Sequence, residues 1–220
     1  MDKNFVYFIL IFLGFCIPSL IYFKKNKTNE FMRKEEIISS FVIFLLTFLF
    51  FAKIGNIILE NNYDVAINDK INVFVRYMKY ILSGYSFICG YVGSILFIII
   101  YSKFNKINSS KLLDMYAPVL TLMYGILKIG CFIKGCCGSH YINGIQLVES
   151  VLSIILYFII NKCNKIKNKG PIFLIGYGTM RIIVSVLRIH TFDYTFVLVE
   201  IMSIFIICYG LYNYKIKKNF

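Results

Sequence analysis

The chain has 220 residues, of which 59% are hydrophobic and 16% charged, and its mean hydropathy is +0.72. This balance excludes a water-soluble domain, because too few polar residues remain to cover its surface. The net charge of +13 does not indicate nucleic-acid binding, since the basic residues lie in short segments between apolar runs rather than on one arm or face.

Seven apolar segments are each close to the roughly 20 residues that cross a bilayer as a helix. In chain order they cover about residues 4–23, 37–59, 82–101, 113–133, 145–161, 171–189 and 195–213. The first predicts a span rather than a signal peptide, because it lacks a small-residue cleavage site and runs into a basic stretch. We therefore predict an all-α, polytopic membrane protein with seven transmembrane helices in a single domain, residues 1–220.

The basic residues between these segments predict the orientation, since Lys and Arg are retained on the cytoplasmic side. Fifteen of the 24 lie in alternate connections and the tail: Lys24, Lys25, Lys27, Arg33, Lys34, Lys103, Lys106, Lys111, Lys162, Lys165, Lys167, Lys169, Lys215, Lys217 and Lys218. The N-terminus is thus expected outside and the C-terminus in the cytoplasm. The longest connection, about residues 60–80, is expected to lie along the outer surface.

Ionisable residues within the spans each need a reason, because one costs roughly 2.5–3.5 kcal/mol to insert. They are Lys53, Lys128, Glu149, Arg181, Arg188 and Glu200. Lys53 and Arg188 lie near span ends, where a long side chain can reach water, and the two glutamates could be internal salt-bridge partners. Arg181 lies about 15 Å into its span, too deep for that, and must face protein, water or an anion. The predicted topology places this set toward the outer face.

Small and thiol-bearing residues accompany the charged ones. Gln146, Glu149 and Ser150 form one cluster on a helix, and Arg181, Ser185 and Arg188 share a face. Glycines near Lys128 predict either close helix packing or a broken helix end whose N–H groups bind an anion. Three nearby cysteines could bind zinc, pack as small apolar groups or carry thiol chemistry; they are Cys131, Cys136 and Cys137, with His140 the nearest histidine.

Four segments in series resemble bacterial prolipoprotein diacylglyceryl transferases over about residues 80–205. The first is GYSFICGYVG, the second LDMYAPVLTLMYGILKIGCFIKGCCG, the third the Gln146-Leu147-Val148-Glu149 run, and the fourth GPIFLIGYGTMRIIVSVLR. The chain departs from the family pattern at several positions. Ile88 stands where the family has a histidine, Lys128 replaces an arginine, Cys131 an asparagine, Val148 a tyrosine and Ser185 a glutamate.

The resemblance implies transfer of a diacylglyceryl group from phosphatidylglycerol to the thiol of a lipobox cysteine, at the outer leaflet of the bacterial cytoplasmic membrane. It implies no cofactor. The expected catalytic residues are Arg181, Lys128 and Glu149, with Gly90, Cys131, Gln146, Arg188 and Glu200 binding substrate. The expected partners are phosphatidylglycerol or a related phospholipid and the lipobox peptide of a prolipoprotein. The alternative is an altered or inactive family member acting as a lipid-binding accessory or immunity protein.

Overall fold

A computed structural model describes residues 3–25, 32–60, 86–135, 143–162, 168–188 and 194–218. Its helices are α1 (Lys3–Lys25), α2 (Lys34–Glu60), α4 (Phe87–Asn105), α5 (Ser109–Lys134), α6 (Ile145–Lys162), α7 (Lys169–Arg188) and α8 (Tyr194–Lys218). All seven are long and apolar enough to span a membrane, which confirms the predicted number of spans. The predicted surface segment at residues 60–80 lies almost wholly outside the described residues.

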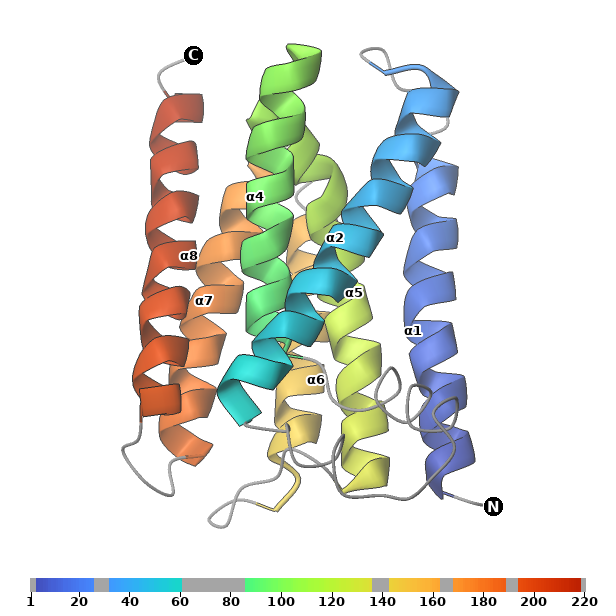
Figure 1. The fold of residues 1–220 in the computed structure, drawn as a ribbon, viewed down its shortest axis with the longest axis vertical. Helices are drawn as coiled ribbons and strands as arrows, with labels where there is room; N and C mark the ends of the chain where they lie inside the picture. The colour runs from blue at the N-terminus through green and yellow to red at the C-terminus, as the bar shows by residue number, and fades with distance from the viewer. Residues whose placement is uncertain are drawn as a thin grey trace.

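The helices form one bundle whose chain termini lie at opposite ends (Figure 1). Helices α1, α4, α6 and α8 run in one direction, and α2, α5 and α7 run in the other. The ends of α5 and α7 therefore lie at the same end of the bundle as the start of α6.

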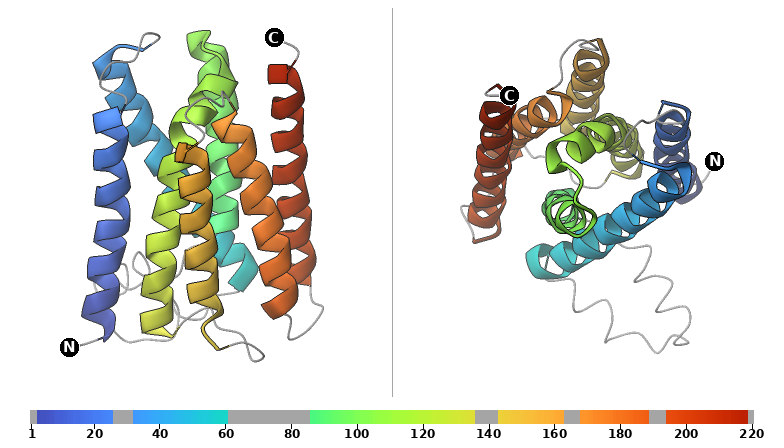
Figure 2. Two further views of the ribbon diagram at one scale, coloured as in Figure 1. Left: turned by 180° about the vertical axis from the view of Figure 1, so that it is seen from behind. Right: turned by 90° about the horizontal axis from the view of Figure 1, so that it is seen from above.

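Helix α5 is the central helix and contacts α1, α4, α6 and α7 (Figure 2). In its membrane-length window 72% of residues are buried, against 18% in α1, so α5 faces protein where α1 exposes most of its surface. Asn108 caps its start by accepting a hydrogen bond from the Ser110 N–H at 2.9 Å. Gly135 ends it in the left-handed conformation at φ 75°.

Close approach of the helices depends on glycine at several crossings. A Cβ added at Gly90 of α4 would lie 2.7 Å from the Phe48 ring of α2, and one at Gly93 would lie 2.4 Å from Phe51. Both glycines are buried. Packing of α4 on α2 therefore requires a residue without a side chain at these two positions.

Candidate active site

Glu149 lies at the centre of a buried charged cluster in which three helices meet. Its side chain, in the second turn of α6, has no exposed surface. One carboxylate oxygen, Oε2, is 2.6 Å from Lys128 Nζ of α5 and accepts a hydrogen bond from the Tyr124 hydroxyl at 3.0 Å. The other, Oε1, is 3.6 Å from Arg181 Nη1 of α7. One carboxylate thus binds both deep cations.

The cluster has one more positive than negative charge. Lys128 is 6% exposed and Arg181 18% exposed, so water screens neither of them well. Lys128 Nζ also lies 5.2 Å from the centre of the Tyr124 ring, in a cation–π contact. A buried ion is costly unless it is paired, and the charges of these three side chains alone sum to one net positive charge. The three residues therefore form an electropositive site that favours an anion.

Two hydroxyls fix α6 against α5 beside this cluster. Ser150 donates a hydrogen bond to the Gly125 carbonyl at 2.8 Å, and Ser153 donates one to the Thr121 carbonyl at 2.7 Å. Gly125 permits the approach, since a Cβ there would lie 3.1 Å from Ile154. These contacts set the rotation of α6 that points Glu149 at α5 and α7.

The structure brings Lys128, Glu149 and Arg181 together, as the sequence predicted. The prediction that a glutamate pairs internally with the cations is confirmed for Glu149. Glu200 of α8 instead accepts a hydrogen bond from the Ser185 hydroxyl, one turn beyond Arg181.

The remaining predicted residues lie around the cluster or apart from it. Gln146 is buried one turn before Glu149, and Cys131 is buried three residues after Lys128. Arg188 is the last residue of α7. Gly90 packs against Phe48, as described above. Their proposed contacts with substrate stay predictions.

No break interrupts α5 beside Lys128, because the helix is continuous from Ser109 to Lys134. The interpretation of Gly125 and Gly130 as a broken helix end is therefore wrong. Gly130 instead gives room to α1, since a Cβ there would lie 3.2 Å from the Tyr7 ring. Close helix packing is what these two glycines provide.

Within the six described stretches, no group of three or more His, Cys, Asp and Glu residues could hold a metal ion. Cys131 is buried in α5. Cys136, Cys137 and His140 lie outside the described residues, so the zinc and thiol interpretations of these cysteines stay predictions.

Three buried tyrosines that sequence reasoning did not select extend the cluster into the core. The Tyr177 ring lies 4.1 Å from the Tyr91 ring and 5.4 Å from the Tyr124 ring, measured between centroids. Tyr91 donates its hydroxyl to the Leu120 carbonyl, and Tyr124 donates to Glu149. Among the residues that the structure describes, the buried Tyr177 hydroxyl finds no hydrogen-bond partner. A sequence signal existed, because each of these tyrosines directly adjoins a glycine in an apolar span.

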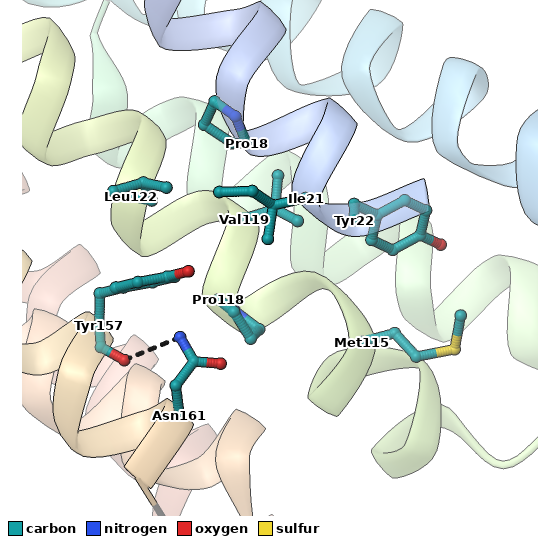
Figure 3. A pocket seen from close by; sticks show the side chains of 9 residues that line it. All are labelled: Pro18, Ile21, Tyr22, Met115, Pro118, Val119, Leu122, Tyr157 and Asn161. Carbon is teal, nitrogen blue, oxygen red and sulfur yellow. Dashed lines mark hydrogen bonds between the residues drawn. The ribbon is translucent and has the colours of Figure 1, made fainter. Parts of the chain in front are cut away.

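A small pocket lies near the other end of α5, between α1, α5 and α6 (Figure 3). Pro118 in its lining is ten residues, or about 15 Å, from Lys128 along the helix. Asn161 beside it donates a hydrogen bond to the Tyr157 carbonyl. Nine residues line the pocket: Pro18, Ile21, Tyr22, Met115, Pro118, Val119, Leu122, Tyr157 and Asn161. None of them is charged, and none is a predicted site residue.

Comparison with known proteins identifies the family to which this chain belongs. Residues 5–215 match prolipoprotein diacylglyceryl transferase. Phosphatidylglycerol--prolipoprotein diacylglyceryl transferase 2 of Clostridium perfringens is 25% identical over 242 residues, covering 98% of this chain and 92% of the relative. The Clostridium tetani enzyme is 22% identical over 84% of this chain and 81% of its own length. The Rickettsia bellii enzyme is 29% identical over 62% of this chain and 59% of its own length. With seven helices able to span a membrane, the chain is a multi-pass membrane protein that belongs to the prolipoprotein diacylglyceryl transferase family.

Proposed function

We propose that this protein transfers a diacylglyceryl group from phosphatidylglycerol to the thiol of a lipobox cysteine. The family match and the activity for which the relatives are named support this proposal. In the reaction a carbon–sulfur bond forms, the carbon–oxygen bond to the phosphate breaks, and glycerol phosphate leaves. The thiol loses its proton in the same process, and the proton ends on the leaving glycerol phosphate, so that atoms and charge balance. The main demand on the protein is to stabilise negative charge on the leaving phosphate.

The observation that carries the proposal is the buried cluster of Lys128, Glu149 and Arg181. Arg181 supplies a planar group that can donate two parallel hydrogen bonds to a phosphate, while Lys128 supplies a compact charge. Glu149 holds both cations in place before lipid arrives. The net positive charge is then available to the phosphate. Lys128 and Arg181 are the proposed phosphate-binding catalytic residues, and Glu149 orients them.

The other predicted residues complete the proposed site. Gln146 and Cys131 lie on the same helices as Glu149 and Lys128 and are proposed to contact the lipid or peptide. Glu200 and Arg188 are proposed as further substrate contacts, and so is Gly90, which lies buried against Phe48. We add the Tyr177 hydroxyl, because a buried donor without a partner can bond to a lipid oxygen that enters the site.

The proposed location is the outer side of the bacterial cytoplasmic membrane. Basic residues between the spans favour an outer N-terminus. The charged cluster lies toward the same end of the bundle as the N-terminus, since it includes the end of α5 and the start of α6. An outer site suits an acceptor that is exported before it is modified.

Complementation tests the activity. Cells depleted of their own transferase and supplied with this chain should regain diacylglyceryl-modified lipoproteins, detected by mass spectrometry. Chains carrying Arg181→Ala should leave the precursors unmodified, whereas Lys103→Ala, which removes an exposed lysine in the last turn of α4, should restore modification. Unmodified precursors with the wild-type chain correctly inserted would overturn the proposal.

One observation favours a second candidate function. Ile88 is 1% exposed and apolar, and the family pattern has a histidine at this position, so no acid–base group is present there. A lipid-binding accessory or immunity protein would need the cationic cluster without the base. Binding of phosphatidylglycerol that depends on Arg181, with no transfer even for an Ile88→His variant, would establish this alternative.

A further inference from the structure

Helices α5 and α7 carry the two cations and are joined at their starts, far from the cluster. The Asp114 carboxylate of α5 accepts a hydrogen bond from the Gly170 backbone N–H at 2.7 Å. Gly170 is the second residue of α7, where backbone N–H groups have no partner within the helix. The negative side chain also suits the positive end of the α7 dipole. Asp114 thus caps a helix to which it does not belong.

The contact has almost no freedom to slide. A Cβ at Gly170 would lie 2.4 Å from Leu113 Cγ, and Leu113 is 1% exposed. The start of α7 is therefore held at one height on α5 by a hydrogen bond and by close packing.

Because an α-helix rises by a fixed length per residue, the axial position of Gly170 on α5 also fixes the axial position of Arg181. Helices α5 and α7 run in the same direction (Figure 1). Lys128 lies 14 residues after Asp114, or about 21 Å, and Arg181 lies 11 residues after Gly170, or about 16 Å. Both intervals are close to whole numbers of turns, so each cation lies on roughly the same helix face as its anchor. A shift of α7 at Gly170 therefore displaces Arg181 along Glu149.

We infer that Asp114 is a positioning residue, which sets the register of α7 on α5 and so the distance between Arg181 and the Lys128–Glu149 pair. The inference rests on the proposed transferase function for its effect on activity. The role of Asp114 in setting the register of α7 on α5 does not depend on that function. Displacement by about 1 Å at a reacting centre can cost on the order of 100-fold in rate.

The test compares two helix caps on the purified full chain, with phosphatidylglycerol vesicles and a lipobox peptide as substrates. Asp114→Ala should lower kcat by about 10- to 100-fold and change KM far less. Asp114→Asn keeps an acceptor and should stay within about threefold of wild type. Asn108→Ala removes the cap of α5 itself, near the same end of the bundle, and should leave kcat unchanged. Equal losses from Asp114→Ala and Asn108→Ala would overturn the inference.

A second readout separates this inference from the proposed function. The chain has no tryptophan, so Phe87→Trp places a single reporter 5.3 Å from the Tyr124 ring, beside the charged cluster. Asp114→Ala should shift the emission of that reporter, and Asn108→Ala should not. If the wild-type chain transfers no lipid, the activity proposal fails and the emission alone decides: a shift supports the register role, and no shift overturns it. If Asp114→Ala does not fold, Asp114→Glu, which lengthens the acceptor arm, replaces it with the same expected shift.

Discussion

Two tyrosine clusters on α5 differ in what their side chains meet. Toward its start, Tyr116 stacks on Phe44 at 4.1 Å between ring centres and donates its hydroxyl to Ser40. Toward its end, Tyr124 donates its hydroxyl to the buried Glu149 carboxylate and packs against Tyr177. Through Tyr116, the first cluster joins α5 to α2 by ring stacking and a neutral hydrogen bond. The second joins α4, α5 and α7 beside two cations and one anion.

The difference separates packing from binding. A hydrogen-bonded neutral cluster stabilises the bundle and leaves little to offer a ligand. Within the described part of the chain the Tyr177 hydroxyl has no hydrogen-bond partner, and the three charges of Lys128, Glu149 and Arg181 sum to one net positive charge. A site with an available hydroxyl donor and a net positive charge is stabilised when it binds an anion. Substitutions in the two clusters test this contrast.

Glu149→Leu should destabilise the protein most. It leaves Lys128 and Arg181 buried without their shared carboxylate, which costs about 3–5 kcal/mol for a broken buried pair. Thermal unfolding in detergent micelles measures the loss. Ser40→Ala is the matched change in the neutral cluster and should cost about 1 kcal/mol. An unchanged melting temperature for Glu149→Leu would show that the cations do not depend on this carboxylate.

Arg181→Lys should abolish most of the activity while the protein stays folded. The substitution keeps the positive charge but loses the planar pair of donors, and removing one such donor to a developing anion costs about 100- to 1000-fold in kcat. Release of glycerol phosphate from phosphatidylglycerol measures it. Full activity would mean that Arg181 serves only to balance Glu149.

Tyr177→Phe and Tyr116→Phe form a matched pair. Tyr177→Phe removes no existing hydrogen bond, so stability should not change, but transfer should fall about 10-fold because a donor to a charged group is lost. Tyr116→Phe should cost about 1 kcal/mol of stability and leave transfer unchanged. The reverse pattern in paired melting and activity measurements would contradict the division between the two clusters.

Gly90→Ala should act through packing rather than through charge or hydrogen bonding. The added methyl group meets the Phe48 ring at 2.7 Å, and overpacking of this kind costs about 1–3 kcal/mol. Phe48→Leu in the same chain should recover part of the melting temperature. Lost transfer without lost stability would instead support the predicted contact between Gly90 and substrate.

The fold followed from the sequence because a bilayer imposes a length on each span. Helix ends were less accurate for local reasons: α5 begins at Ser109 rather than near residue 113, since Asn108 caps it. Helix α8 continues to Lys218, beyond the predicted end of the span at residue 213, because no glycine or proline interrupts its polar last turns.

The site followed in part. Buried charge marked Lys128, Glu149 and Arg181, because each is expensive in lipid. Hydropathy could not decide that Glu149 rather than Glu200 pairs with them, since that depends on how each helix is rotated in the bundle. Tyr177 escaped notice because a tyrosine in an apolar span is ordinary, and only the packed structure shows that its hydroxyl lacks a partner.

The most direct measurement is a structure of the protein in lipid nanodiscs containing phosphatidylglycerol. We expect a head-group phosphate within hydrogen-bonding distance of Lys128 and Arg181, with the Tyr177 hydroxyl turned toward a lipid oxygen. A Glu149–Arg181 pair unchanged from the lipid-free geometry, with the head group bound elsewhere, would contradict it.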